Sequence, residues 1–411
     1  MHKISEESLK KMKSLMKNRN ITVFLYVFFG FFLVSAGSVS WVFHLAEIGT
    51  AWSFDLVSTI IAYLFQTVGI TIFTLLVRLH KSPVQKKTFV MTIYILYVFF
   101  LFPSMFAAYI TGTFLFGFVM NLLGGMIEGG FLHALSYMVD YRKRGLVFGG
   151  AGFAATLLIG LILLIAGGAF FKSTFSILVY APIAVILYFL SVHGEQEIHV
   201  IRENVNNPGT AGVKTKYIPA LLLACATVTL SGLVREIVLY YPNAESGQEN
   251  GPRALLFFYA TGLLLAGILS DLNRKFGLAG AFISVVLPFL MKLPVCKSLP
   301  EILKSGPDKF FYGFLIVFSV LLFADLCLPR KTETQTENEK KKNERGDILK
   351  TAGFAFGFGF LFGRLGEAVG TLFRILLADR GIVLYCLVGV FFVILLILYF
   401  RLFFSKQKEN L

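Results

Sequence analysis

The stretch 353–377, GFAFGFGFLFGRLGEAVGTLFRILL, decides the fold class of this chain. It is apolar over more than the roughly 20 residues that a helix needs to cross a bilayer, yet it carries Arg364 and Glu367. A charge within hydrocarbon is costly, and it is usually retained for a function and faces a polar interior. The i, i+3 spacing places both side chains on one face of a helix. The stretch therefore predicts a membrane helix that lines a path or cavity inside a bundle.

The composition of the whole chain agrees with a membrane protein. Of its 411 residues, 56% are hydrophobic and only 15% are charged, and 45 are Phe, which is more apolar surface than a soluble fold can bury. The net charge of +14 is compatible with nucleic-acid binding. The charges, however, lie in short runs between apolar stretches, as orientation signals do. We therefore expect a lipid bilayer and no nucleic acid as the partner.

A window of about 19 residues finds twelve candidate membrane spans. We place them at 21–46, 54–78, 88–110, 113–139, 146–171, 174–193, 217–241, 253–271, 277–293, 309–328, 350–378 and 381–404. The polar stretch 194–216 divides them six and six. The predicted fold is an all-α membrane protein in which twelve transmembrane helices form two pseudo-symmetric six-helix halves.

Charged loops predict the orientation, because cytoplasmic loops are enriched in Lys and Arg. The first 20 residues are basic, and so is every second loop: Arg78 to Lys87, Arg142 to Arg144, Arg202 to Lys216, Arg274 with Lys275, Arg330 to Lys350, and Lys406 with Lys408. The other loops are poor in these residues, except the one with Lys292, Lys297, Lys304 and Lys309. We expect a cell-membrane protein with both termini cytoplasmic.

The chain then divides into five parts. A basic cytoplasmic segment, 1–20, is expected to be retained rather than cleaved as a signal peptide. It is followed by a six-helix half at 21–193, a cytoplasmic linker at 194–216, a second half at 217–404 and a cytoplasmic tail at 405–411.

Motifs of other protein classes are missing from the sequence. The four cysteines, Cys225, Cys296, Cys327 and Cys386, have neither metal-binding spacing nor the pattern of a disulfide framework. There is no nucleophile elbow, P-loop or zinc motif. We expect no enzyme, no ATP-driven pump acting alone, no metal and no cofactor.

The arrangement of twelve spans, together with two sequence features, carries a resemblance to a known family. The loop GILSDLNRK, Gly267 to Lys275, resembles the Gly-x3-Asp-(Arg/Lys)-x-Gly-(Arg/Lys)-(Arg/Lys) loop of the major facilitator superfamily, although Arg274 replaces its second Gly. The glycine-rich openings of spans five and eleven, 148–155 and 353–360, resemble an internal repeat six spans apart. The first-half position of the loop motif, which begins at Arg78, lacks both Gly and Asp.

The resemblance implies which helices surround a central cavity. Spans one, four, seven and ten would line it, and spans two, five, eight and eleven would flank it. Spans three, six, nine and twelve would support the bundle from outside. The charges agree with this plan, because 88–110, 174–193, 277–291 and 381–400 contain no Asp, Glu, Lys, Arg or His. Intramembrane charges fall in spans four and eleven.

Glu128 is the main candidate for substrate binding or proton coupling, together with Asn121, Arg364 and Glu367. It lies at mid-depth in span four, and Asn121 is two turns earlier on nearly the same stripe. A carboxyl in a low-dielectric cavity can exchange a proton near neutral pH; it can instead stay ionised to bind a cation, or pair permanently with Arg364. His133 is about 140° around the helix from Glu128, and a core position is the simpler interpretation.

Two further sets of residues are candidates for a gate or conformational lock. His44 and Glu47 lie at the outer end of span one, and Arg235 lies at the outer end of span seven. The family resemblance implies that these two tips meet when the outside closes, which would bring opposite charges together. Asp271 and Arg274 lie at the inner end of span eight, where Asp271 can bind backbone donors or neighbouring cations. Each of these charges has a simpler alternative as a solvated interfacial residue.

The sequence thus predicts a monomeric secondary transporter of a small organic molecule, with protons as the coupling ion and alternating access as the mechanism. A membrane sensor or regulatory protein that does not transport is the alternative, and a lipid transporter is a third. The substrate is not specified by any motif.

Overall fold

The computed structural model describes most of the first half of the chain and part of the second. The described residues are 19–48, 52–79, 87–191, 251–291, 296, 298–326, and the single positions 368, 372, 383, 386, 389, 390, 393, 394 and 397. All regular secondary structure within them is helical. The predicted spans at 217–241, 350–378 and 381–404 lie outside the described residues, apart from these single positions.

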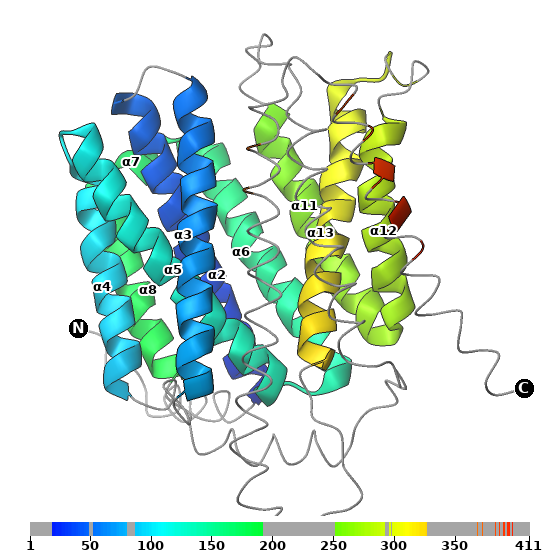
Figure 1. Cartoon of the computed structure of the whole chain (residues 1–411), viewed down its shortest axis with the longest axis horizontal. Helices are drawn as coiled ribbons and strands as arrows, with labels where there is room; N and C mark the ends of the chain where they lie inside the picture. The colour runs from blue at the N-terminus through cyan, green and yellow to red at the C-terminus, as the bar shows by residue number, and fades with distance from the viewer. Residues whose placement is uncertain are drawn as a thin grey trace, which may run out of the picture.

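Eleven helical segments are described (Figure 1). They are α2 (Arg19–Ile48), α3 (Trp52–Leu79), α4 (Lys87–Phe106), α5 (Ile110–Met138), the 3-10 turn η1 (Tyr141–Lys143), α6 (Arg144–Ala166), α7 (Ala169–Lys172), α8 (Thr174–Ser191), α11 (Gly251–Leu272), α12 (Arg274–Leu290) and α13 (Glu301–Leu326).

Five stretches of the described helices are long and apolar enough to cross a membrane. They are Asn20–Leu45, Phe89–Phe106, Ile110–Leu135, Tyr141–Ala166 and Leu255–Leu272, and shorter apolar stretches occupy Leu64–Phe73 and Thr174–Leu190. The chain is therefore a multi-pass membrane protein. Helices satisfy their own backbone hydrogen bonds, which is why apolar segments of this length take this form in lipid.

Two helix boundaries differ from the sequence prediction. Span five was expected to run to residue 171, but α6 ends at Ala166 because Gly167 adopts φ 59°, and its N–H donates to the carbonyl of Leu163. Such a positive φ suits glycine and ends a helix. Span ten was expected to begin at 309, but α13 begins at Glu301 and includes Pro307.

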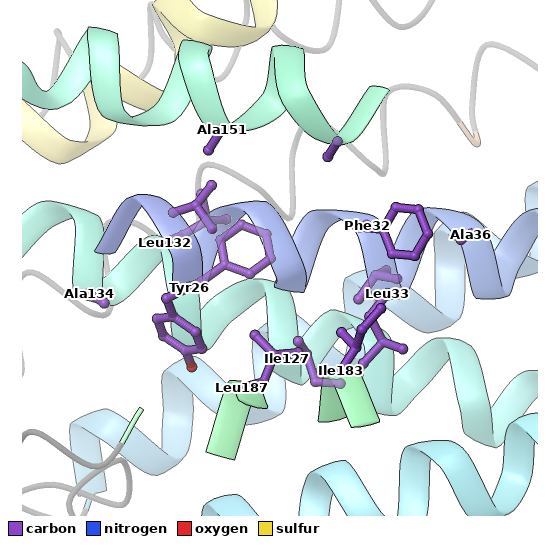
Figure 2. Close-up of a cluster of buried hydrophobic side chains, with 14 of the residues drawn as sticks. Tyr26, Phe32, Leu33, Ala36, Ile127, Leu132, Ala134, Ala151, Ile183 and Leu187 are labelled. Atoms are coloured by element: carbon purple, nitrogen blue, oxygen red, sulfur yellow. The ribbon is translucent and has the colours of Figure 1, made fainter. Parts of the chain in front are cut away.

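Helix α2 lies at the centre of the first half and packs against α5, α6 and α8. Figure 2 shows Tyr26, Phe32 and Leu33 of α2 among side chains of the other three helices, including Ile127 and Leu132 of α5 and Leu187 of α8. These side chains are almost fully buried. The dense packing fixes the position of α5, which carries the candidate site residues.

Helices α4, α8 and α12 lie at the edges of the bundle (Figure 1). Their outward faces are apolar and exposed, with Ile95, Phe99 and Phe102 on α4 as one such row. An exposed apolar face at helical spacing is what contact with lipid tails requires. These are the helices expected to support the bundle from outside.

The two groups of helices, α2–α8 and α11–α13, meet mainly where α6 lies along α11 (Figure 1). The backbones touch there, because a Cβ at Gly149 would overlap the carbonyl oxygen of Leu263, and one at Gly267 would overlap that of Gly145. Small residues permit such an approach in membranes. The glycine-rich opening of span five therefore serves helix packing; its counterpart at 353–360 lies outside the described residues.

One end of the bundle is rich in basic residues, and we call it the basic end. There α2 and α6 begin and α5 and α11 end. It carries Arg19, Arg142, Lys143, Arg144, Arg274 and Lys275.

Candidate functional site

Glu128 lies on α5 and is buried, with 6% of its surface exposed. It lies near Tyr97 of α4, whose hydroxyl donates to the carbonyl of Leu33 on α2. A carboxyl enclosed between helices in this way is costly to keep and marks a functional position by default.

The neighbours of α5 define the direction in which Glu128 points. Gly117 and Gly124 face α2, Gly125 and Gly129 face α3, and Met120 faces α4 through a contact with Ser104. At 100° per residue, Asn121 and Glu128 fall between the α2 side and the α3 side. Both side chains therefore point between α2 and α3, and the hydrogen bonds of Asn121 to Ser38 and Gln66 agree with this direction.

Asn121 belongs to a buried polar cluster that joins three helices. It is 1% exposed, and its Oδ1 accepts hydrogen bonds from Gln66 Nε2 of α3 at 3.1 Å and from Ser38 Oγ of α2 at 3.3 Å. Its Nδ2 donates to the carbonyl of Gly117 at 2.8 Å. Gln66 and Ser38 were not identified from the sequence, where single uncharged polar residues in apolar helices give little signal.

His133 lies on the α3 side of α5, away from the Asn121 and Glu128 stripe. It is 5% exposed, and its ring meets Phe73 of α3 edge to face at 6.1 Å. This position agrees with the simpler interpretation of His133 as a core residue.

At the basic end, Asp271 connects α11 to the first turn of α6. Its two carboxylate oxygens accept hydrogen bonds from the backbone N–H groups of Gly145 at 2.8 Å and Leu146 at 2.7 Å. The first N–H groups of a helix have no partner within that helix, and the helix dipole favours a negative charge there. These are contacts with backbone donors of the kind expected for Asp271; its role as a lock stays a prediction.

Arg274 completes this arrangement. Its guanidinium pairs with Asp271 at 3.0 Å, donates to the carbonyl of Tyr141 at 2.7 Å, and lies over the Tyr141 ring at 4.3 Å from the centroid. Arg274 therefore holds Asp271 in place and reaches η1 of the other helix group at the same time. A guanidinium suits this double task because its donors form a planar fork and its face stacks on aromatic rings.

A second charged contact between the helix groups was not predicted from the sequence. Arg144, at the start of α6, is fully buried, and it donates from Nε to the carbonyl of Val139 and from an Nη to the carbonyl of Ala324 in the last turn of α13, both at 3.2 Å. The last carbonyls of a helix favour a cation. In the sequence, Arg144 is one of three consecutive basic residues, so only its loop position was evident.

At the opposite end of the bundle, the expected gate residues have other described partners. Glu47 pairs with Lys172 of α7 at 2.6 Å, and the Lys172 ammonium lies 5.8 Å from the ring centroid of Phe43. His44 Nε2 is 3.1 Å from the carbonyl oxygen of Ala107. Lys172 was overlooked because it sits alone between two spans.

Three candidate residues, Arg235, Arg364 and Glu367, lie outside the described residues. Ala368, which follows Glu367, is helical and 3% exposed. The pairing of Arg235 with Glu47 and the polar face of span eleven remain predictions.

The structure adds Asp308 as a buried carboxyl in the second helix group. It lies two turns into α13 and is 4% exposed. Asp308 lies just outside the predicted span ten, because Glu301, Lys304 and Lys309 lower the hydropathy of this region.

Comparison with known proteins places the fold. No family model and no curated protein matches the sequence. Among solved structures, the chain is similar to the proton:xylose symporter XylE of the major facilitator superfamily, bound to 6-bromo-6-deoxy-D-glucose, with a TM-score of 0.63, 12% identity and coverage of 95% of each chain. It is also similar to the human organic anion transporter MFSD10 (TETRAN), with a TM-score of 0.60, 11% identity and coverage of 94% of this chain and 99% of that chain.

The chain therefore has the fold of major facilitator superfamily transporters. At these identities, the similarity establishes the fold alone. The family resemblance drawn from the sequence is confirmed at the level of the fold.

Proposed function

We propose that the protein is a secondary active transporter of a small organic molecule that works by alternating access and is driven by protons through Glu128. The observation that carries this proposal is the buried carboxyl of Glu128 on a membrane-length helix of a transporter fold. A protonatable group that is enclosed between helices is suited to binding a proton in one conformation and releasing it in another.

The contacts at the basic end support alternating access. Asp271 and Arg274 of the second helix group bind η1 and α6 of the first, and Arg144 of the first binds α13 of the second. The two groups thus cap each other's helix ends reciprocally. We infer that the structure represents a state closed at the basic end, which is the cytoplasmic side in the proposed twelve-helix topology.

Opening at the basic end requires that the hydrogen bonds between the two helix groups break. Separation of the helix groups at the basic end would expose the first N–H groups of α6 and the last carbonyls of α13 to water. The lost hydrogen bonds are each worth about 0.5–3 kcal/mol net, so the closed state is favoured without being permanent.

The test is transport by the full chain in proteoliposomes with and without an imposed proton gradient. D-xylose and a set of organic anions are the first compounds to test, because similar structures belong to transporters of these molecules. We expect accumulation of a substrate above its external concentration only with the gradient. Accumulation that is independent of the gradient would reject proton coupling, and a chain that binds but never moves its ligand would favour a sensor.

The role of Glu128 has its own prediction. Glu128→Gln keeps the size and the hydrogen-bonding capacity but removes the titratable proton. It should abolish accumulation driven by the gradient and leave exchange of labelled for unlabelled substrate intact. Asp308→Asn is the matched control, since it neutralises a second buried carboxyl. Normal accumulation by Glu128→Gln would remove Glu128 from the coupling mechanism.

A further inference from the structure

We propose that Ser38, Gln66 and Asn121 form a substrate subsite, the amide subsite, which accepts a hydroxyl group of an uncharged small molecule. The proposal rests on the proposed transport function and deepens it, because it names a binding position and the chemistry of the substrate.

The hydrogen-bond network determines how the amide groups are oriented. Asn121 Nδ2 donates to the carbonyl of Gly117, so its Oδ1 faces the other way and acts as an acceptor. Of the two amide atoms of Gln66, only Nε2 can donate to that oxygen, which lies 3.1 Å away, and Nε2 also lies 3.4 Å from Ser38 Oγ. The Oε1 of Gln66 is therefore the remaining acceptor of the cluster.

This Oε1 atom is buried and has no hydrogen-bond partner among the residues that the structure describes. Gln66 as a whole is 4% exposed. A buried acceptor without a donor costs about 1–3 kcal/mol. A ligand that donates a hydrogen bond to Gln66 Oε1 would recover this free energy, so the cluster is incomplete by one donor.

The cluster lies on the side of α5 that we assign to substrate. Asn121 and Glu128 share the stripe between the α2 and α3 sides of α5 and are seven residues apart, about 10 Å along the helix. Gln66 is near the middle of α3, whose backbone lies against Gly125 of α5. One small molecule could therefore contact the amide subsite while Glu128 changes its protonation.

The chemistry of the cluster favours a hydroxyl over an ammonium group. Its side chains are uncharged, and they offer hydroxyl and amide groups that both donate and accept. A hydroxyl can donate to Gln66 Oε1 and accept in return. An ammonium group brings three donors and a charge, whereas the cluster has one open acceptor and Glu128 lies about 10 Å away along the helix. A site that pairs with a hydroxyl also rejects analogues that lack it.

The test is the reaction of cysteines in the full chain with a membrane-impermeant methanethiosulfonate reagent, in a variant whose four native cysteines are replaced by serine. Gln66→Cys and Ser38→Cys are compared with Ser104→Cys, whose buried hydroxyl on α4 is bonded to the carbonyl of Leu101. We expect the two subsite cysteines to react at least about tenfold faster than the control. In Ser38→Cys, which keeps Gln66, glycerol, D-xylose or myo-inositol should slow that reaction about tenfold, as occupancy worth about 1.4 kcal/mol would, whereas n-butylammonium should not.

The outcomes separate this proposal from the proposed function. If Glu128→Cys reacts while the cysteines at 66 and 38 do not, the amide subsite is a closed structural cluster that holds at most a water molecule, and transport through the Glu128 face stands. If none of the three reacts, the substrate face itself is wrong. Protection by n-butylammonium, or by neither kind of compound, would overturn the assignment to a hydroxyl group.

Discussion

At the scale of single residues, Asp271 shows how one carboxylate joins helices that are 125 positions apart in the sequence. It satisfies two backbone donors that α6 cannot satisfy itself, and it is held by Arg274. A carboxylate at a helix N-terminus gains from both the hydrogen bonds and the dipole. Asp271 should therefore stabilise mainly the first turn of α6.

Asp271→Ala should loosen that turn. Loss of a helix cap costs about 0.5–2 kcal/mol, which raises the opening equilibrium roughly 2- to 30-fold. Hydrogen–deuterium exchange at Gly145 and Leu146 should accelerate by this factor, while exchange near Ala166 stays constant. Asn273→Ala, which removes an acceptor used only by the nearby Lys275 N–H, is the control. Unchanged exchange in Asp271→Ala would show that the contact does not hold the helices together.

The pair of Glu47 and Lys172 should contribute little to stability. Their side chains are 47% and 37% exposed, and exposed ion pairs are typically worth about 0–1 kcal/mol. A double-mutant cycle with Glu47→Ala and Lys172→Ala, measured by unfolding, should give a coupling in this range. A second cycle with Arg235→Ala would test the outer gate, because Glu47 can pair with Arg235 only at the expense of Lys172. If the effects of Glu47→Ala and Arg235→Ala on the free energy of unfolding are additive, the two residues do not pair, and Arg235 is an interfacial anchor.

Some residue roles could be predicted from the sequence and others could not. Asp271 was identified because it follows a glycine by four positions in a recognisable loop. Glu128 was identified because a carboxyl stands out in an apolar helix. The role of Arg144 was not predicted, because it donates to the carbonyl of Ala324, 180 positions away. Every residue has a backbone carbonyl, so the sequence does not indicate which one accepts a hydrogen bond. Gln66 was missed for the same reason, since its partners come from two other helices.

At the scale of helices, the closeness of α6 and α11 varies along their length. At Gly149 and Gly267 a Cβ would overlap backbone oxygens of the facing helix, whereas at Gly160 the nearest atom would lie at 3.7 Å, an ordinary contact. The helices are therefore closest toward the basic end. This is also where Asp271 and Arg144 connect the two groups, so packing and charge act at the same place.

Gly149→Ala should be harmful and Gly160→Ala should not, although both lie on one face of one helix. The first places a methyl group against the Leu263 carbonyl, and overpacking of this kind costs about 1–3 kcal/mol. The second adds a methyl group at contact distance and should change stability by about 0.5–1 kcal/mol at most. Thermal unfolding in detergent would compare them. Equal midpoints for the two variants would contradict the close approach.

The helix boundaries show the limit of hydropathy. Most helices were predicted within a few residues, because apolar stretches of about 20 residues must be helical in lipid. The start of α13 was missed by eight residues, since Glu301, Lys304, Asp308 and Lys309 lie in its first turns. The break at Gly167 was missed because glycine is common within membrane helices and only its backbone angle shows that it ends one.

At the scale of the whole molecule, the charge pattern and the structure lead to a common account of sidedness. The basic residues gather at the end where α2 begins, and the contacts between the helix groups lie there too. The one loop that broke the rule, with four lysines on the opposite side, is partly explained, because Lys304 and Lys309 belong to α13 rather than to a loop. The proposed topology then assigns the basic end to the cytoplasm.

Labelling of single cysteines in sealed cells would test this topology. In a variant without native cysteines, Ser246→Cys and Pro300→Cys should react with an impermeant reagent added outside. Seven predicted spans precede position 246 and nine precede position 300, and an odd number of crossings from a cytoplasmic N-terminus ends outside. Pro208→Cys and Thr336→Cys should react only after the cells are opened. Each membrane crossing reverses the side on which the chain lies, so a single missing or extra span would invert every later position. Reaction at 246 but protection at 300 would place the error between α11 and α12, whereas reaction at 336 in sealed cells would overturn the cytoplasmic assignment of the basic end itself.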